Sequence, residues 1–261
     1  MLVKKTPWLI LHEPRPEARI RLFCFPYAGG GSGLYRRWAL DMPAHIEVVA
    51  VEPPGRQTRF SEPPPGGLGE IVDALTDATD ALIGKPYATF GYSLGSIVSV
   101  EFVRNIVQKG KPAPIHMFCS AHRAPHIEPR QDPVHMLTDH ELVQRLAELG
   151  GTSEELLARP EWLRPFLKTI RADLRIAERY CTSTPFALPS RLSVFGGTLD
   201  KNVEIGSLLA WETYSDGPFK LRLVEGGHFF IHTSAVEVMS HILTDLSMVH
   251  NNVPGICPPH T

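Results

Sequence analysis

The chain has 261 residues, of which 43% are hydrophobic and 21% charged, a composition that fits one large α/β domain and excludes a disordered chain. Its formal net charge of -2 gives no overall electrostatic reason to expect a nucleic acid or a membrane as partner. The four cysteines are scattered without a C-x-x-C pair, and the N-terminus has no apolar run long enough for a signal peptide or a membrane span, so we expect a cytoplasmic protein with free thiols.

Short apolar runs alternate with amphipathic segments along most of the chain. After a leader with an early edge strand in residues 1–18, strands are predicted at residues 20–25, 46–51, 87–90, 115–120, 191–195 and 220–224. Helices are predicted at residues 35–41, 68–83, 96–107, 204–214 and 234–249. Strands that alternate with helices predict an α/β fold with a mostly parallel central sheet, flanked by helices on both faces.

One long segment, residues 121–189, interrupts this alternation. It contains no convincing strand, and its entry and exit are marked by prolines. Its helical patterns lie at residues 139–149, 153–158 and 162–181. Ligands bind at the carboxyl edge of such sheets, and long insertions in compact domains are usually functional, so we predict a helical lid rather than ordinary crossover packing. The predicted division is a core of residues 1–120 and 190–250, a lid of residues 121–189, and a disordered tail of residues 251–261.

The most informative stretch is G-Y-S-L-G at residues 91–95, which follows a predicted strand and precedes a predicted helix. Strand, sharp turn and helix in this order form the setting of the nucleophile elbow of α/β-hydrolases. The turn would expose the Ser93 hydroxyl at the carboxyl end of the sheet. Gly91 and Gly95 would be required, because a Cβ at either position would collide with a neighbouring element. The alternative is a serine in an ordinary tight turn.

A serine hydroxyl is a poor nucleophile at neutral pH and requires a base that is itself oriented by a third group. In α/β-hydrolases these groups follow in the order serine, acid, histidine. Asp200 and His228 each come just past the end of a predicted strand, at the same edge as Ser93, so we predict these three residues as a catalytic triad. The rivals for these roles are His232 as base and Asp216 or Glu225 as acid.

The glycine-rich loop at residues 26–33 lacks both G-x-G-x-x-G and the P-loop pattern, which argues against a phosphate site. In a hydrolase sheet, the loop after an early strand supplies one donor of the oxyanion hole, and the residue after the nucleophile supplies the other. We therefore predict that the backbone N–H groups of Ala28 and Leu94 are the oxyanion donors.

Two pairs of histidines have the i,i+4 spacing of metal ligands on a helix. The pairs are His122 with His126 and His228 with His232. Neither pair is accompanied by a carboxylate or cysteine pattern, whereas zinc sites usually group their ligands tightly. We therefore expect no metal site.

Six motifs, in order along residues 20–245, resemble those of the type II thioesterases of polyketide and nonribosomal peptide synthesis. They are F-P-Y-A-G-G-G at residues 25–31, P-G-R at 54–56, G-Y-S-L-G at 91–95, R-A-D at 171–173, F-G-G-T-L-D at 195–200 and G-G-H-F-F at 226–230. The resemblance implies an α/β-hydrolase core with a mobile helical lid, and it implies the same triad and oxyanion donors. His122, which precedes Arg123, occupies a position where many relatives have a smaller residue. The sequence therefore does not determine the shape of the pocket entrance.

Members of this family hydrolyse acyl thioesters on the phosphopantetheine arm of carrier proteins, clearing stalled or wrongly primed chains. The resemblance therefore implies a monomeric serine thioesterase whose partners are acyl or peptidyl carrier domains. It implies no cofactor, because the substrate carries the phosphopantetheine. Nothing in the triad excludes an oxygen ester, so the thioester assignment depends on the resemblance. Open alternatives are a general acyl-CoA or small-ester hydrolase, an inactive hydrolase-fold binding subunit, and a transferase that passes the acyl group to an acceptor other than water.

Two further sets of side chains are candidates for contacts with the substrate and with the carrier. The residues assigned to substrate binding are Tyr27, Met136, Phe166 and Phe229. An apolar roof over a short acyl chain would comprise Met136, Leu142, Leu146, Leu149, Phe166 and Ile170; the alternative is that these residues bury the lid on the core. The arginines that an acidic carrier protein would meet, unless they are merely solvated, are Arg36, Arg37, Arg56, Arg59 and Arg123.

Overall fold

The computed structural model describes residues 6–130, 132–151, 155 and 159–250, and a seven-stranded sheet forms its centre. The strand order is β1-β3-β2-β4-β5-β6-β7, with β1 antiparallel to β3 and all other neighbours parallel. The strands are β1 Leu9–Ile10, β2 Ile20–Phe25, β3 Ile46–Val51, β4 Tyr87–Tyr92, β5 His116–Ser120, β6 Arg191–Gly197 and β7 Phe219–Val224. The predicted mostly parallel sheet is confirmed, and the early edge strand is the short β1.

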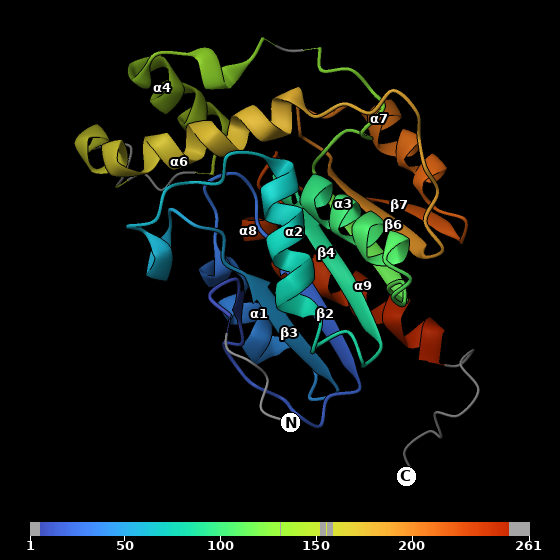
Figure 1. Cartoon of the computed structure of the whole chain (residues 1–261). Helices are drawn as coiled ribbons and strands as arrows, with labels where there is room; N and C mark the ends of the chain where they lie inside the picture. The colour runs from blue at the N-terminus through green and yellow to red at the C-terminus, as the bar shows by residue number, and fades with distance from the viewer. Residues whose placement is uncertain (1–5, 131, 152–154, 156–158, 251–261) are drawn as a thin grey trace.

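Helices cover both faces of the sheet, because successive side chains of each strand point into two different apolar cores. In β2, Phe23 and Phe25 face the core shared with α2 and α3, whereas Leu22 and Cys24 face the core shared with α1 and α9. These helices are α1 Arg36–Asp41, α2 Leu68–Thr79, α3 Leu94–Gln108 and α9 Ala235–His250. Figure 1 shows α2 and α3 in front of the strands and α9 behind them.

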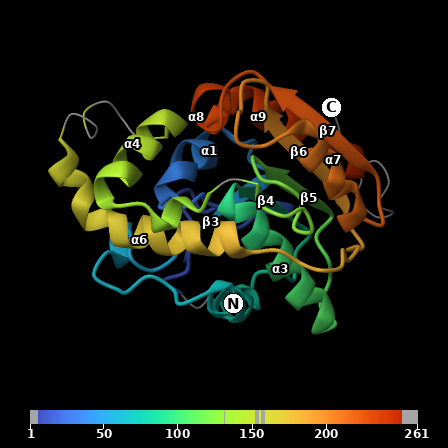
Figure 2. The same cartoon turned by 90° about the horizontal axis from the view of Figure 1, so that it is seen from above.

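The described part of residues 121–189 forms a helical layer above the sheet. This layer contains the 3-10 turn η3 Val134–Met136 and the helices α4 Asp139–Leu149 and α6 Pro160–Arg179. Viewed from above, α6 runs across the molecule with α4 beside it (Figure 2). The helix predicted at 162–181 begins two residues earlier, because Pro160 fits the first turn of a helix. Most of the helix predicted at 153–158, and the tail at 251–261, lie outside the described residues.

The helical layer is attached to the core mainly through α6. Leu142, Leu163 and Leu167 form a small apolar cluster between α4 and α6. Ile176 and Ala177, nearer the end of α6, belong to the main core under α2 and α3. The two ends of α6 therefore have different partners, and only the C-terminal end is packed as part of the core.

Two predicted helices differ clearly from the structure, and one short helix was not predicted. The helix predicted at 68–83 ends at Thr79, and Leu82 and Ile83 are buried in the turns that follow, so their spacing reports burial rather than helical hydrogen bonding. The segment predicted at 204–214 is a short α7, Ile205–Leu209, followed by the 3-10 helix η4, Ala210–Tyr214, and the short α8, Phe230–Thr233, precedes α9. Among the described residues, no helix has the length and apolar character needed to cross a bilayer.

Candidate active site

Ser93 lies in the sharp turn between β4 and α3, in a backbone conformation that is strained for a residue with a side chain. Its φ is 51° and its ψ is -115°, in the positive-φ region that favours glycine. A Cβ at Gly91 would lie 2.3 Å from the Gly95 carbonyl oxygen, and a Cβ at Gly95 would lie 2.1 Å from the Phe25 carbonyl oxygen. The collisions predicted for both glycines are confirmed, and they place the loop after β2 directly against the elbow.

The loops after β6 and β7 are held together and bring Asp200 to His228. The Leu199 N–H donates to the Gly226 carbonyl oxygen at 2.9 Å. A Cβ at Gly197 would lie 2.5 Å from that same oxygen, so only glycine permits this approach. His228 Nδ1 lies 2.9 Å from Asp200 Oδ2. The acid and the base predicted from chain order are therefore in hydrogen-bonding contact.

The Asp200 carboxylate is almost fully buried and accepts several hydrogen bonds. Its side chain is 1% exposed, and its Oδ1 accepts from the backbone N–H of Asn202 at 2.8 Å and from the Asn202 side-chain amide at 3.2 Å. Burial raises the pKa of Asp200, but hydrogen bonds from His228 and Asn202 lower it by more than burial raises it. This pKa therefore lies below the ordinary aspartate value. An ionised carboxylate only accepts, so His228 carries its proton on Nδ1 and leaves Nε2 available as a base.

Tyr92, the residue before Ser93, fixes the backbone of the histidine loop. Its hydroxyl donates to the His228 carbonyl oxygen at 2.7 Å and accepts from the Ile231 N–H at 3.3 Å. The ring is fully buried. The second residue of G-Y-S-L-G thus connects the elbow to the loop that carries the base, a role that the motif itself does not reveal.

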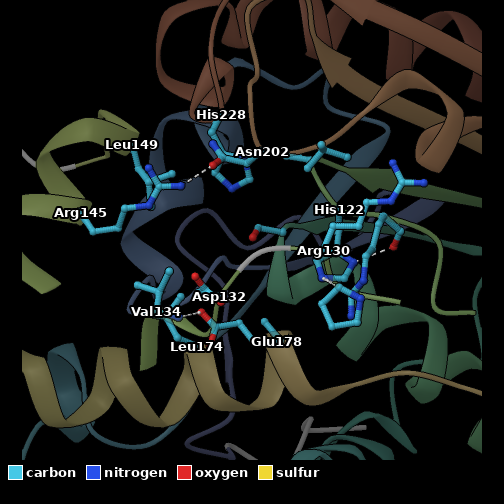
Figure 3. A pocket seen from close by; sticks show the side chains of 16 residues that line it. His122, Arg130, Asp132, Val134, Arg145, Leu149, Leu174, Glu178, Asn202 and His228 are labelled. Carbon is cyan, nitrogen blue, oxygen red and sulfur yellow. Dashed lines mark hydrogen bonds between the residues drawn. The ribbon is translucent and has the colours of Figure 1, made fainter. Parts of the chain in front are cut away.

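Ser93 and His228 line one cavity of about 170 Å³, between the sheet edge and the helices α4 and α6. The apolar part of its wall is Ala121, Val134, Leu149, Leu174, Ala177 and Val203. Figure 3 shows His228 on one side of this cavity, opposite side chains carried by α6. No hydrogen bond joins Ser93 to His228 within the part of the chain that the structure describes; bonds between catalytic groups often shorten only when the substrate binds.

Ala28 and Leu94, the predicted oxyanion donors, lie in the loop after β2 and at the start of α3. Leu94 follows Ser93 as the first residue of α3, where the helix carries a partial positive charge. Ala28 follows β2, and the contact between Phe25 and Gly95 brings that loop to the same helix end. Neither N–H donates to another group among the described residues, so both are available to an anion.

The rival acid and base candidates are engaged elsewhere or point outward. His232 Nε2 lies 3.1 Å from the Tyr27 hydroxyl, and Asp216 and Glu225 are exposed. Among the described residues, the carboxylate that contacts the His228 ring is Asp200. Within the same residues, no group of three or more histidine, cysteine or acidic side chains is placed to hold a metal ion.

The four side chains predicted to bind substrate do not reach the cavity. Met136 is 69% exposed, and Phe166 is 39% exposed and packs on Phe60 with ring centroids 5.4 Å apart. Tyr27 and Phe229 pack edge to face on each other, with centroids 5.0 Å apart. None of the four belongs to the cavity wall, so the structure does not support their assignment as substrate contacts.

The predicted apolar roof is only partly present. Leu149 lines the cavity, but Leu142 and Leu146 pack between α4 and α6. Ile170 lies over Gly29, where an added Cβ would be 2.7 Å from the isoleucine side chain. Most of these residues therefore pack the helices of this layer against each other or against the core, which was the alternative interpretation, because an amphipathic helix must first bury its own apolar face.

Three of the five arginines predicted to meet a carrier protein are used inside the protein. Arg56 and Arg59 are 4% and 7% exposed, and each is paired with a carboxylate of the chain. Arg123 donates to the carbonyl oxygens of Ile127 and Tyr180 at 2.8 Å each. The prediction is wrong for these three, because the sequence does not show which acceptors folding brings to a cation. The exposed members of the set are Arg36 and Arg37.

Two polar residues complete the site. Asn202, which motif reasoning missed, accepts at its Oδ1 from Arg145 of α4 at 2.8 Å (Figure 3); the only sequence signal was its place two residues after Asp200, typical of an Asx turn. His122 lines the cavity and is 8% exposed. Burial, with the nearby charge of Arg123, lowers the pKa of His122 to about 3, so a neutral ring narrows the cavity.

Comparisons with known proteins place this site in a family. A family model described as a thioesterase domain matches residues 20–246. The gramicidin S biosynthesis protein GrsT of Aneurinibacillus migulanus is 34% identical over 244 residues, which cover 93% of this chain and 94% of GrsT. The medium-chain S-acyl fatty acid synthase thioesterase of Homo sapiens is 33% identical over 233 residues, covering 85% of this chain and 84% of that protein.

The same similarity appears in three dimensions. The structure of the type II thioesterase BorB from the borrelidin biosynthetic cluster matches with a TM-score of 0.83 and 32% identity, over 94% of this chain and 98% of BorB. Together with the parallel sheet and its flanking helices, this match confirms the predicted α/β-hydrolase fold.

Proposed function

This chain belongs to the thioesterase family, and from that premise we propose that it removes stalled or aberrant acyl groups from the phosphopantetheine arm of carrier proteins in a nonribosomal peptide or polyketide assembly line. Its reaction class, hydrolysis of thioesters, follows from the family. The relatives named for gramicidin S and borrelidin biosynthesis support the pathway. The arm belongs to the substrate, so the proposal includes no cofactor.

In the proposed mechanism, Ser93, His228 and Asp200 act in sequence. Ser93 Oγ attacks the thioester carbonyl carbon while His228 Nε2 takes the hydroxyl proton, and Asp200 stabilises the imidazolium. The carbon–sulfur bond then breaks, the arm leaves as a thiol with the proton from His228, and the acyl group remains as an ester on Ser93. Water attacks this ester with His228 again as base, which releases the carboxylic acid and restores the Ser93 hydroxyl.

The oxyanion of each tetrahedral intermediate would be bound by the N–H groups of Ala28 and Leu94. Both are unoccupied as donors among the described residues, and the N-terminus of α3 adds a favourable dipole. Loss of one such donor typically raises the barrier by about 3 kcal/mol. Residues 121–189 would act as the lid, which closes the cavity through α4 and α6.

In this proposal, the phosphopantetheine arm passes His228 on its way to Ser93. Arg145 and Lys201 line a second hollow, of about 420 Å³, that also touches His228. Arg145 is paired there with Glu148 at 2.9 Å, so Lys201 is the residue that would supply positive charge where a phosphate of the arm approaches. Lys201→Glu should therefore raise KM for an acyl-loaded carrier protein and leave KM for a p-nitrophenyl ester unchanged; Arg37→Glu tests the alternative docking prediction in the same assay.

The observation that carries the proposal is the buried Asp200–His228 hydrogen bond beside Ser93 in a single cavity. The test is hydrolysis of a panel of acyl-loaded carrier proteins by wild type and Ser93→Ala, with a fluorophosphonate probe to label Ser93. Wild type should turn over the carriers and bind the probe, and the variant should do neither. An unlabelled wild-type protein without turnover would identify an inactive binding subunit.

A second candidate is hydrolysis of free acyl-CoA or of fatty acyl thioesters. The similarity to the human medium-chain fatty acid synthase thioesterase favours it. The same panel separates the two, because kcat/KM for acyl-CoA should be well below that for the carrier-bound acyl group if the carrier is the partner. Detection of an acylated acceptor other than water would instead identify a transferase.

A further inference from the structure

Three motifs that the triad does not use meet at one buried junction between α6 and the loop after β2. Asp173 of R-A-D accepts, at Oδ2, the Gly29 N–H at 2.8 Å and Arg56 Nη1 at 2.6 Å; its Oδ1 accepts Arg56 Nη2 at 3.1 Å. Arg56 of P-G-R also donates to the Gly30 carbonyl oxygen at 3.0 Å. The glycine loop is thus bound on both its N–H and its C=O side.

The junction is dry and geometrically constrained. The side chains of Arg56 and Asp173 are 4% and 2% exposed. A buried ion pair contributes little net stability compared with apolar packing, since both ions must be desolvated, but a bidentate pair fixes direction and distance. The pair therefore fixes the position of the glycine loop relative to α6.

Two glycines beside this ion pair pack closely against α6. Gly29 has φ +79°, and a Cβ there would lie 2.7 Å from the side chain of Ile170. Gly55 has φ +84°, and a Cβ there would lie 2.7 Å from Thr169 Oγ1, which donates to the Gly55 carbonyl oxygen at 3.1 Å. Two turns therefore fit closely against consecutive residues of α6.

We propose that Asp173 and Arg56 are positioning residues that hold the Ala28 N–H at the site of the developing oxyanion. The Gly29 N–H held by Asp173 belongs to the peptide plane that follows Ala28, and the Gly30 N–H closes the turn on the Tyr27 carbonyl oxygen at 2.9 Å. With the planes on that side fixed, the direction of the Ala28 N–H is fixed too. This inference rests on the proposed function, which makes Ala28 an oxyanion donor.

The test is steady-state hydrolysis of an acyl thioester by Asp173→Asn and Arg56→Lys, at a temperature where each variant is fully folded. Displacing a catalytic group by 1 Å costs about 100-fold in rate, so we expect kcat to fall by roughly that factor while KM changes little. The rate of fluorophosphonate labelling of Ser93 should fall in parallel, because the phosphonyl oxygen uses the same donors.

Arg171→Gln is the matched control on the same helix. Arg171 donates to the carbonyl oxygens of His135 and Leu137, at 2.7 and 2.5 Å, and to Asp139, so it fastens α6 to η3 and α4 and not to the glycine loop. We expect a lower Tm with kcat unchanged.

A double variant separates positioning from stability. Arg56→Met with Asp173→Leu removes both buried charges together, so its Tm should lie nearer the wild type than that of either single variant, while kcat stays low. A folded double variant, or a folded Asp173→Asn, with wild-type kcat would overturn the positioning role and leave the proposed function intact. Hydrolysis that survives in Ser93→Ala would overturn the proposed function instead.

Discussion

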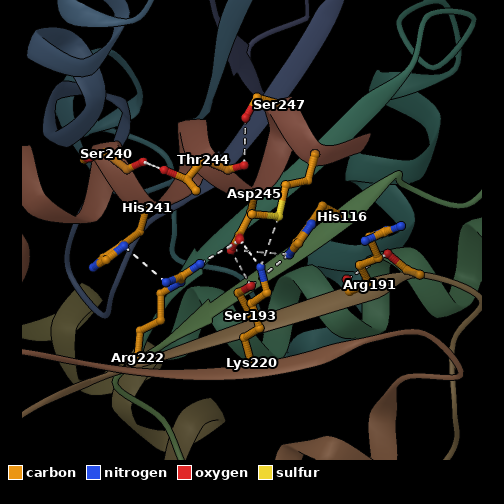
Figure 4. A network of polar contacts seen from close by, with 12 residues as sticks. His116, Arg191, Ser193, Lys220, Arg222, Ser240, His241, Thr244, Asp245 and Ser247 are labelled. Carbon is orange, nitrogen blue, oxygen red and sulfur yellow. Dashed lines mark hydrogen bonds and ion pairs between the residues drawn. The ribbon is translucent and has the colours of Figure 1, made fainter. Parts of the chain in front are cut away.

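Two groups of serine, histidine and aspartate lie beside the same sheet, and the proposed function assigns catalysis to one of them. At the carboxyl edge of the sheet, Asp200 contacts the His228 ring, and Ser93 lines the cavity. In the interior, Ser193 lies between the other two members of its group: its hydroxyl donates to Asp245 Oδ2 at 2.7 Å and lies 2.9 Å from His116 Nε2 (Figure 4).

The order of hydrogen bonds separates the two groups. In the interior group the serine proton is held by a carboxylate, so the histidine can only donate to the serine oxygen and cannot act as its base. Burial lowers the pKa of His116 to about 4, which keeps the ring neutral. Asp245 also accepts from Lys220 and Arg222, each at 2.6 Å. The residue types are the same, but the interior group joins α9 to β5, β6 and β7, whereas Ser93 and His228 of the edge group line the cavity.

Replacement of each serine should give the sharpest contrast. Ser93→Ala should lower kcat by a factor on the order of 10⁶, because the nucleophile is lost. Ser193→Ala should leave kcat unchanged and lower the unfolding free energy by about 1–3 kcal/mol, because His116 and Asp245 each lose a buried partner. The measurements are thioester turnover and urea unfolding of both variants. Equal loss of turnover in the two would refute the distinction.

Replacement of each aspartate should divide the effects in the same way, between turnover at the edge and stability in the interior. Asp200→Asn should lower kcat by about 10⁴, because the His228 ring loses the carboxylate that fixes its tautomer. Asp245→Asn should cost about 3 kcal/mol of unfolding free energy, because the charges of Lys220 and Arg222 lose their partner. Its kcat per folded molecule should equal that of the wild type. A large fall in that kcat would mean that the interior group does contribute to the reaction.

Two of the buried histidines, His116 and His122, should make the unfolding free energy depend on pH. The pKa of His116 and of His122 is lowered from 6.5, to about 4 and about 3, so the unfolded chain binds protons that the folded chain does not. Their stabilisation is complete above pH 6.5 and is lost as the pH falls toward 4, by roughly 3 kcal/mol for each ring. Urea unfolding at several pH values in this range measures the slope of the unfolding free energy against pH.

Matched variants identify the source of that slope. His116→Asn should remove about half of it, whatever its effect on stability at pH 7. His140→Asn, at an exposed position of α4, should leave it unchanged. A wild-type slope in His116→Asn would show that the interior histidine is already protonated in the folded protein and would weaken the contrast with the edge group.

The edge group was predictable from the sequence because its determinants are local. Gly91, Gly95 and Gly197 each prevent a backbone collision within or beside the turn that they flank, and chain order supplied the rest of the triad. The same reasoning failed where long-range pairing decides. Arg56 meets a carboxylate 117 residues away, so it was mistaken for a docking residue, and nothing near Ser193 in the sequence indicates its partners. Apolar periodicity predicts the helices α4 and α6 but not the faces that they turn to the cavity.

The smallest effects should come from Asn202 and Arg145, through which α4 is connected to the Asp200 carboxylate. Asn202→Ala removes the side-chain donor at 3.2 Å but keeps the backbone donor at 2.8 Å, so kcat should fall about fivefold, the equivalent of one hydrogen bond of about 1 kcal/mol. Arg145→Gln should lower kcat by less, because it removes a donor to the Asn202 side-chain oxygen but none of the hydrogen bonds to Asp200.

Glu148→Gln is the control for this prediction, since Glu148 is another partner of Arg145, at 2.9 Å, and makes no contact with Asp200 among the described residues. Its kcat should match the wild type. If Arg145→Gln lowers kcat and Asn202→Ala does not, the lid acts on the reaction by another route than the acid. If both lower kcat and the double variant is no slower than Asn202→Ala alone, the two side chains work as one connection. The edge group would then differ from the interior group in a second way, because a residue of α4 would help to set the orientation of its carboxylate.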